Sequence, residues 1–501
     1  MSSLQSSLRI GYLDDLTLGG TASTVATDVQ TIIREAGKMG LTLNFAKCEI
    51  IYTHEVNLPS PLDSFTITSS CDAFLLGAPL SADRALHDAL EMRCTELSLG
   101  ISRLASVAKH DALILFRSSL SSPILLHTLR CFPCMGHPIL FQFDQIMRTG
   151  LVNTLNLAIA DSNWVQATLP VKHGGLGIRR VSSLALPAFL ASAAGTASLQ
   201  ASILSNCDVP QDCSLAMAQE QWLIDSGAPL PEANLSHKQC SWDHPLILKD
   251  LAALEASVVT DYHRARLRAV ASPHAGDWLL ALPISACGLR LSDEAVRIAT
   301  GLRLGADLCA PHECPCGATV QEDGSHGMSC SLGPGRTARH ASLNDIIWRG
   351  LTKAGFPATK EPTGLARSDG RRPDGVTLIP WEGGKSLAWD ATVIDTLAVS
   401  YRTRSAEVAG AAAEIAADRK TTKYTAILPS YCFVPLAFET LGPINQEGLA
   451  LINLLGYRLA QTSGDNRETT FLFQRLSMTI QRFNAVAFSS TFLTHQSICE
   501  D

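Results

Sequence analysis

The sequence predicts a multidomain α+β protein, and three observations support this prediction. The length of 501 residues allows about three domains of ordinary size. Leu and Ile recur at three- and four-residue spacing over residues 82–161 and, with interruptions, over 181–305, which predicts helices. Short alternating apolar runs near residue 10 and over 340–445 predict strands in small sheets.

The composition is that of a folded protein with one basic region. Apolar residues make up 46% of the chain and charged residues 17%, which excludes a disordered or fibrous protein. The net charge of −7 argues against a uniformly basic nucleic-acid binder. Residues 331–425 nevertheless carry 14 Lys and Arg against 10 Asp and Glu. We therefore expect any polyanion-binding role in this late segment.

The cysteines and the apolar stretches indicate a location inside the cell. The 15 cysteines are scattered and odd in number. The first residues lack the cationic segment followed by an apolar segment that marks a secretory signal peptide. We expect reduced thiols, no secretion, and a nuclear or cytoplasmic location. The uncharged stretch Val181–Cys207 is rich in Ala and Ser and contains Pro187. It predicts a buried helix rather than a membrane span, so no membrane partner is expected.

The first motif of chemical interest is Tyr12-Leu13-Asp14-Asp15, between two apolar runs that predict a β-hairpin. Two carboxylates at a tight turn repel each other unless a cation lies between them, so the motif suits Mg²⁺. The alternative is an ordinary Asp-Asp turn. A helix is predicted over Val25–Met39, followed by the strand-like segment GLTLNFAKCEII, which contains Lys47.

The second motif is a cluster of Cys and His residues at 309–330. Three thiolates and one imidazole are ligands that suit tetrahedral Zn²⁺, and glycines between them supply backbone freedom. The predicted ligands are Cys314, Cys316, His326 and Cys330. Cys309 and His312 lie close by as substitute ligands, and unrelated free cysteines are the alternative. Four protein ligands leave no open position, so the predicted site is structural.

The third motif combines acids with a basic loop. Ser342 and Asp345 predict the start of a helix that Gly355 ends. Glu361 comes next, then the basic loop, then Asp374 at the start of a predicted strand, and a Gly-Gly turn leads into the strand SLAWDATVI. Alternation places Asp390 on one face of this strand, opposite its large apolar residues.

Together these residues predict a Mg²⁺ site that activates water against a phosphodiester. The predicted metal-binding acids are Asp374, Asp390 and Glu361. The predicted phosphate contacts are Arg367, Arg371 and Arg372. A helix predicted over residues 405–424 ends in Lys420 and Lys423, which could stabilise charge on the scissile phosphate. The alternative is an ordinary hairpin with solvated acids.

The motifs carry a family resemblance. YLDD on a hairpin, with a helix and GLTLNFAKCE after it, resembles the late palm motifs of reverse transcriptases. The segment LPVKHGGLGIR resembles the region after the thumb in non-LTR retrotransposon enzymes. The order of Glu361, the basic loop with Pro-Asp, the strand with Asp390 and the helix with two lysines resembles a restriction-like PD-(D/E)XK nuclease. The Cys and His cluster that precedes these residues resembles a zinc knuckle. The whole order is similar to the C-terminal part of a site-specific non-LTR retrotransposon protein.

The resemblance implies an organisation in six segments. The predicted segments are the end of the palm at 1–60, a thumb-like helical region at 61–180, a helical linker at 181–305, a zinc knuckle at 306–333, a restriction-like endonuclease at 334–465 and a helical tail at 466–501. Asp374 and Asp390 match the two metal-binding acids of the nuclease, and Glu361 an upstream acid. Thr392 stands where the simplest motif has lysine, so Lys420 or Lys423 is the expected replacement.

The implied function is a Mg²⁺-dependent endonuclease that nicks target DNA for target-primed reverse transcription. The polymerase residues implied are Tyr12, Asp14, Asp15 and Lys47. Only eleven residues precede Tyr12, whereas the family's first metal-binding aspartate lies further upstream, so this chain alone is expected not to copy RNA. The expected partners are target DNA, element RNA and an upstream reverse-transcriptase portion. The alternative function is a catalytically inactive nucleic-acid-binding remnant.

Overall fold

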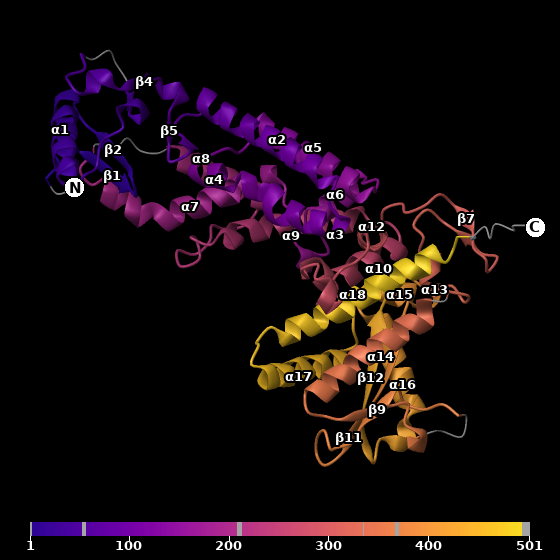
Figure 1. The fold of residues 1–501 in the computed structure, drawn as a ribbon. Helices are drawn as coiled ribbons and strands as arrows, with labels where there is room; N and C mark the ends of the chain where they lie inside the picture. The colour runs from indigo at the N-terminus through magenta and orange to yellow at the C-terminus, as the bar shows by residue number, and fades with distance from the viewer. Residues whose placement is uncertain (1–2, 53–56, 208–212, 334, 366–369, 493–501) are drawn as a thin grey trace, which may run out of the picture. The chain divides into compact units, whose positions relative to one another are not determined.

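The computed structural model describes residues 3–52, 57–207, 213–333, 335–365 and 370–492 (Figure 1). Helices predominate, and the sheets have two to four strands, which confirms the expected mixture of helices and small sheets. The chain forms two compact units. Unit 1 comprises Met1–Leu99, Ser122–Ile146 and Arg180–Lys249, and unit 2 comprises Gly100–Ser121, Met147–Arg179 and Asp250–Asp501. Three long helices, α2, α5 and α9, contribute residues to both units.

Unit 1 contains short strand pairs and long helices. Its elements are β1 (Leu8–Tyr12), β2 (Asp15–Gly19), α1 (Ala22–Lys38), β3 (Glu49–Ile51), β4 (Thr66–Thr68), β5 (Phe74–Leu75), β6 (Ala78–Pro79), α2 (Arg84–Leu104), α4 (Leu126–Cys131), α5 (Pro138–Leu155), α7 (Val181–Ile203), α8 (Cys213–Ser226) and α9 (Gln239–Ser257). Strands β1 and β2 form an antiparallel hairpin in which Tyr12 pairs with Asp15. This confirms the predicted hairpin, and α1 confirms the helix predicted after it.

The strand predicted after Gly40 is mostly absent. Only Glu49–Ile51 at its end forms a strand, β3, which pairs in parallel with β4. The preceding residues Phe45–Lys47 form a single 3₁₀ turn. Alternating Leu and Phe positions alone did not specify a strand here, because no neighbouring strand among the described residues pairs with that part of the segment.

The prediction that α7 is a buried helix is correct for its first half only. Its first half is packed against α4 and α8, whereas most of its second half is exposed. Two described segments, Lys109–Cys131 and Val181–Ile203, are long and apolar enough to cross a membrane by length and composition. A core helix of a soluble protein passes the same test, so these segments are weak evidence for a membrane span.

Unit 2 contains the largest sheet among the described residues. Its elements are α3 (Lys109–Leu115), α6 (Asp161–Ala167), α10 (Asp261–Val270), α11 (Asp277–Leu280), α12 (Asp293–Leu304), β7 (His312–Glu313), β8 (Thr319–Val320), α13 (His326–Ser329), α14 (Gly335–Lys353), β9 (Ala358–Lys360), β10 (Gly375–Thr377), β11 (Ser386–Ile394), α15 (Val399–Glu407), α16 (Ala411–Lys423), β12 (Tyr431–Glu439), α17 (Gln446–Ser463) and α18 (Glu468–Ser489).

The four-stranded sheet has the order β12-β11-β10-β9 and helices on both faces (Figure 1). Strand β11 pairs in parallel with β12 and antiparallel with β10. Leu387 and Trp389 of β11 join a hydrophobic core with α14, α17 and α18, while Ala388 packs with Tyr424 on the side of α16. Because alternate residues of a strand face opposite sides, Asp390 lies opposite Leu387 and Trp389, as the sequence predicts, and this face is turned toward α16.

Two helix boundaries differ from the prediction. Helix α14 begins at Gly335 rather than near Ser342, so Ser342 and Asp345 lie inside it, and Asp345 pairs with Arg349 and Lys360. The helix predicted over residues 405–424 is two helices, α15 and α16, separated near Gly410, which has a φ of 81°. Glycine adopts this conformation readily, and it redirects the chain so that α16 packs on the sheet.

The glycine-rich loop after Leu169 is held by a buried arginine of unit 2. The Arg303 guanidinium donates to the main-chain carbonyls of Val171, Gly175 and Ala275 at distances of 2.7, 3.0 and 3.3 Å. Arg303 itself is only 2% exposed. Burial of a charged group is offset when its donors are satisfied, so these bonds fix the loop on helix α12.

Candidate functional site

The four predicted zinc ligands come from two small elements of unit 2. Cys314 and Cys316 lie in the turn of the β7–β8 hairpin, which Gly317 closes with a φ of 85° and a hydrogen bond from its amide to the Cys314 carbonyl. His326 opens the short helix α13, and Cys330 follows its last residue. The hairpin and the helix therefore supply two ligands each.

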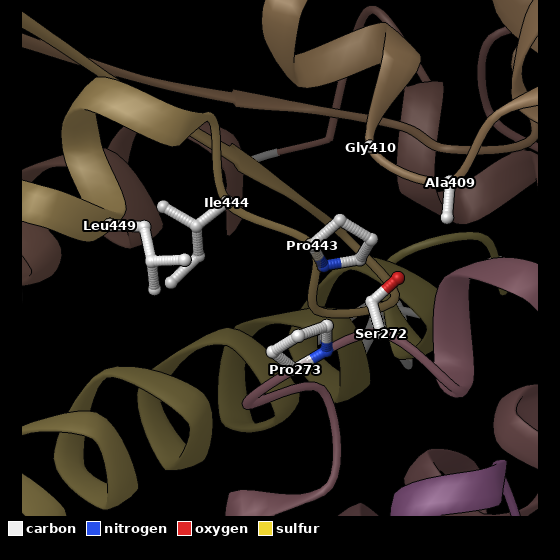
Figure 2. Close-up of a pocket in the computed structure, with 7 residues that line it drawn as sticks. All are labelled: Ser272, Pro273, Ala409, Gly410, Pro443, Ile444 and Leu449. Atoms are coloured by element: carbon white, nitrogen blue, oxygen red, sulfur yellow. The ribbon is translucent and has the colours of Figure 1, made fainter.

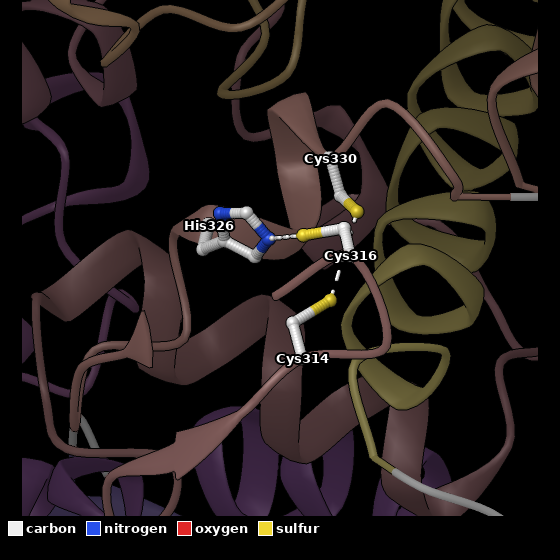
Figure 3. A group of neighbouring side chains, drawn as sticks. All are labelled: Cys314, Cys316, His326 and Cys330. Carbon is white, nitrogen blue, oxygen red and sulfur yellow. Dashed lines mark hydrogen bonds between the residues drawn. The ribbon is translucent and has the colours of Figure 1, made fainter. Parts of the chain in front are cut away.

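The side chains of these four residues converge (Figure 3). Cys314 Sγ lies 3.7 Å from Cys330 Sγ, and Cys316 Sγ lies 3.2 Å from His326 Nε2. The four ligand atoms all lie within 4.8 Å of one another. Three sulfur atoms and one imidazole nitrogen at these separations fit the bond lengths of tetrahedral Zn²⁺, so this group could bind a metal ion such as zinc.

The two substitute ligands make other contacts. The His312 ring stacks on Phe492, and its Nε2 forms a hydrogen bond of 3.0 Å with Thr491 Oγ1. The Cys309 thiol donates to the carbonyl of Gln321 at 3.5 Å. Neither residue belongs to the group whose ligand atoms converge. The structure thus brings together the four predicted ligands and leaves the two substitute ligands outside the group.

The thiols of the cluster have different pKa values. Burial raises the pKa of Cys314 to about 11, and its side chain is 4% exposed. A hydrogen bond from the Ala318 amide lowers the pKa of Cys316. Zinc binds thiolates, so metal binding would release a proton from Cys314 at neutral pH, and the affinity should rise with pH.

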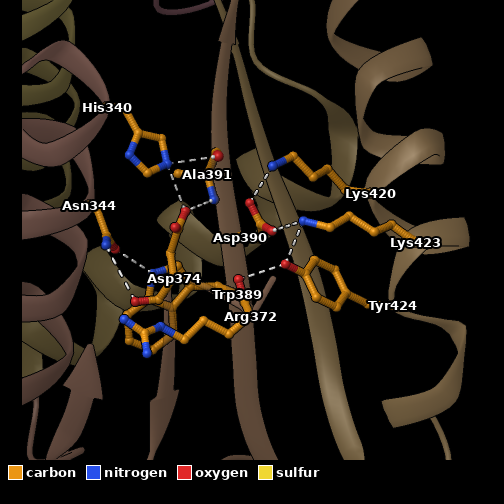
Figure 4. A network of polar contacts seen from close by, with 10 residues as sticks. All are labelled: His340, Asn344, Arg372, Asp374, Trp389, Asp390, Ala391, Lys420, Lys423 and Tyr424. Atoms are coloured by element: carbon orange, nitrogen blue, oxygen red, sulfur yellow. Dashed lines mark hydrogen bonds and ion pairs between the residues drawn. The ribbon is translucent and has the colours of Figure 1, made fainter. Parts of the chain in front are cut away.

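The second candidate site lies at the β10–β11 pair of unit 2. Gly375 pairs with Trp389, so the preceding residue, Asp374, lies beside Asp390 along the two strands. Figure 4 shows the Asp374 carboxylate toward His340 of α14 and the Asp390 carboxylate toward the lysines of α16. Residues predicted from three separate segments of the sequence are thereby brought together.

Asp390 is buried and contacts two lysines. Lys420 Nζ lies 2.5 Å from Asp390 Oδ1, and Lys423 Nζ lies 3.6 Å from Oδ2. Lys423 Nζ also lies 2.7 Å from the hydroxyl of Tyr424, which donates to the carbonyl of Arg372 at 2.7 Å. Burial lowers the pKa of Lys423. The 3% exposed Asp390 is compensated by cations from a neighbouring helix, as a buried carboxylate requires.

Asp374 makes a different set of contacts. Its Oδ2 accepts a hydrogen bond of 2.6 Å from the Ala391 amide and lies 2.9 Å from His340 Nε2. Asn344, one turn further along α14, donates to the Asp374 carbonyl at 3.4 Å and accepts from Trp389 Nε1 at 2.8 Å. His340 and Asn344 were not expected at this site, because the sequence predicts the start of the helix after His340 and neither residue belongs to a motif.

The other predicted residues of this site are dispersed. Glu361 follows β9 and accepts a hydrogen bond from Arg372. Its own amide donates to the Asp374 carbonyl at 2.9 Å, so its backbone lies next to the site. Arg371 is exposed, and Arg372 is partly exposed. Arg367 lies outside the described residues.

The side chains at this site supply only some of the oxygen ligands that Mg²⁺ requires. Among the described residues, no third Asp, Glu, His or Cys side chain joins Asp374 and Asp390 in a ligand group as dense as the Cys₃His cluster. Mg²⁺ is usually held by one or two carboxylates with substrate phosphates and water. The Asp374 carboxylate is turned toward His340 and the Asp390 carboxylate toward the lysines, so the two would hold the ion only together with oxygen ligands from a phosphate and water.

The predicted polymerase residues lie in unit 1. Tyr12 ends β1 and is 59% exposed, Asp14 lies in the turn, and Asp15 begins β2. Lys47 is exposed in its 3₁₀ turn. The hairpin presents both carboxylates to solvent, and they belong to no ligand group among the described residues.

A small pocket of unit 2 lies apart from both candidate sites. Its volume is about 90 Å³, enough for a few water molecules (Figure 2). It is lined by Ser272, Pro273, Ala409, Gly410, Pro443, Ile444 and Leu449. With no charged or metal-binding side chain in its lining, this pocket offers no chemistry to a reaction.

Comparison with models of known protein families gives no match. Comparison with curated proteins gives no significant similarity. The function of the chain is therefore inferred from the two sites themselves.

Proposed function

We propose that the segment 334–465 is a Mg²⁺-dependent endonuclease that nicks target DNA. The observation that carries this proposal is that Asp374 and Asp390 lie side by side at the β10–β11 pair, with Lys420 Nζ 2.5 Å from Asp390 Oδ1. They occur in the order acid, strand, acid, helix, lysine, which resembles restriction-like nucleases. The excess of basic residues over 331–425 supports a polyanion as substrate.

The protein residues have separable roles in this proposal. Asp374 and Asp390 would hold Mg²⁺, which lowers the pKa of a bound water and neutralises the phosphate. Lys420 would stabilise the charge that develops on the scissile phosphate, because its ammonium group is already held next to Asp390. Arg371 and Arg372 would contact flanking phosphates without distinguishing sequences.

The biological role we propose is that of a non-LTR retrotransposon protein. Nicking would provide a 3′ end for target-primed reverse transcription, with element RNA as template and an upstream reverse-transcriptase portion as partner. The Tyr12–Asp15 hairpin supports this proposal through its resemblance to the palm motif, and the Cys₃His group through its resemblance to a zinc knuckle. Such a protein would act in the nucleus after synthesis in the cytoplasm.

A plasmid-nicking assay with Mg²⁺ tests the nuclease, alongside DNA binding measured in Ca²⁺. Asp374→Ala and Asp390→Ala should each abolish nicking and leave binding intact or slightly tighter, because a negative charge near the DNA is removed. Asp418→Ala is the matched control, since Asp418 is an exposed acid on α16. Equal nicking by wild type and both active-site variants would refute the assignment.

One observation favours a second candidate function, a catalytically inactive nucleic-acid-binding remnant. Asp390 contacts two lysines and Glu361 contacts Arg372, so these acids are already neutralised by protein cations. If the wild type binds DNA but does not nick it with any divalent metal, this second function replaces the first.

A further inference from the structure

We infer that His340 is a positioning residue that orients the Asp374 carboxylate in the site. This inference rests on the proposed nuclease function and extends it to a residue that none of the sequence motifs contains. His340 lies on α14, across the sheet from the lysines of α16 (Figure 4).

The contacts of the His340 imidazole indicate which of its nitrogens carries a proton. His340 Nε2 lies 2.9 Å from Asp374 Oδ2 and 3.1 Å from the carbonyl oxygen of Ala391. A carboxylate oxygen and a carbonyl oxygen are both acceptors, so Nε2 must carry the proton and donate. His340 therefore connects the Asp374 side chain to the backbone of the strand that carries Asp390.

The Asp374 carboxylate is held by two donors on the same oxygen. The Ala391 amide donates to Oδ2 at 2.6 Å, in addition to His340. The backbone of Asp374 is fixed separately, through its amide to the Trp389 carbonyl and its carbonyl to the Glu361 amide, each at 2.9 Å. His340 can thus affect the rotation of the carboxylate without being needed for strand pairing.

Helix α14 is a firm support for this contact. The residue before His340, Arg339, is buried and donates to Asn484 Oδ1 at 2.9 Å on α18. Asn344 accepts from Trp389 Nε1 at 2.8 Å one turn later. A donor on a helix anchored at both sides holds a carboxylate more accurately than one on a loop, which is the requirement for a catalytic acid.

The test compares His340→Ala, His340→Gln and His340→Asn with the wild type in plasmid nicking, with DNA affinity measured in Ca²⁺. The terminal amide of Gln reaches the position of Nε2, whereas that of Asn reaches only the position of Nδ1. We expect His340→Ala and His340→Asn to lower kcat about 10- to 100-fold with DNA affinity unchanged, and His340→Gln to restore most of it. Thr337→Ala, an exposed change one turn earlier on α14, is the matched control.

Two results would overturn the inference: an unchanged kcat in His340→Ala, or an equal loss in the Gln and Asn variants. A measurement independent of activity is hydrogen exchange at the Ala391 amide, which should be faster in His340→Ala because its acceptor becomes mobile. If the wild type does not nick DNA, the nuclease proposal fails, and this exchange rate alone decides the positioning role. Unchanged exchange would then refute it. Thermal unfolding of each variant separates these effects from loss of the fold.

Discussion

Lys420 Nζ lies 2.5 Å from Asp390 Oδ1, although the two residues are 30 positions apart in the chain. Strand β11 carries Thr392, two residues after Asp390, where the simplest nuclease motif has lysine. Helix α16 supplies a lysine to the same carboxylate from the covering layer. In the nuclease proposed above, α16 would therefore supply the ammonium group that the strand lacks.

This relationship predicts different roles for the two lysines. Lys420→Ala should slow nicking about 100-fold or more with little loss of DNA binding, because Lys420 makes the closer contact with Asp390. Lys423→Ala should have a smaller effect, since Lys423 also contacts the Tyr424 hydroxyl. Single-turnover nicking rates decide this, with Lys385→Ala, an exposed change just before β11, as a control for loss of a positive charge. A larger loss in Lys423→Ala would reassign the role.

The zinc site predicts about one tightly bound Zn²⁺ per chain. Cys314→Ser should lose the metal and unfold at a lower temperature, because binding free energy contributes to folding. Cys309→Ser should keep both, since the Cys309 thiol contacts a carbonyl outside the ligand group. Metal analysis of the purified variants is the measurement, and equal zinc content in Cys314→Ser and the wild type would remove the site.

The arginines beside the site predict a change in the salt dependence of DNA binding. The slope of log K against log[salt] is about −0.9 for each phosphate contact with duplex DNA. Arg371→Ala combined with Arg372→Ala should therefore weaken binding and flatten the slope by up to about 2. Binding titrations in Ca²⁺ at several salt concentrations measure this. A parallel shift with an unchanged slope would contradict the phosphate contacts.

Asp395 predicts a pH-dependent stability. Burial raises its pKa in the folded protein, where it accepts hydrogen bonds from the Leu397 amide and the Thr440 hydroxyl. The unfolded chain releases this proton near pH 4, at about the ordinary pKa of Asp. Between the two pKa values the folded state binds more protons, so the free energy of unfolding falls as the pH rises.

Asp395→Asn removes this titration. Its stability relative to the wild type should increase as the pH rises from about 4 through the raised pKa, and then stay constant. Urea unfolding of both proteins at several pH values measures the difference. The exposed Asp418→Asn serves as the control. A difference between Asp395→Asn and wild type that does not change with pH would contradict the prediction.

Arg303 predicts an effect on stability. Arg303→Met should lower the free energy of unfolding by about 3 kcal/mol, because three carbonyls near the glycine-rich loop lose their donor. Arg404→Ala removes only an exposed ion pair with Glu407 and should cost less than about 0.5 kcal/mol. Urea denaturation compares the two. Similar losses in both variants would show that the buried contacts contribute little.

Local sequence patterns were sufficient to predict several elements of this protein. The Tyr12–Asp15 hairpin, helix α1, strand β11 and the four converging Cys and His residues are predicted by alternation, helical spacing and ligand spacing. Each of these patterns lies within a short segment of the chain, so it does not depend on how distant segments pack. The choice of Cys314 and its partners over Cys309 and His312 agrees with the structure for the same reason.

Packing between distant segments determines which helix residues face the acids. The contact of Lys420 with Asp390 and that of His340 with Asp374 depend on how α16 and α14 pack on opposite faces of the sheet. The true start of α14 at Gly335 also depends on packing, because intrinsic propensity is too weak to set this boundary. Long-range packing therefore fixed the positions of the candidate catalytic groups, whose residue types the sequence had already supplied.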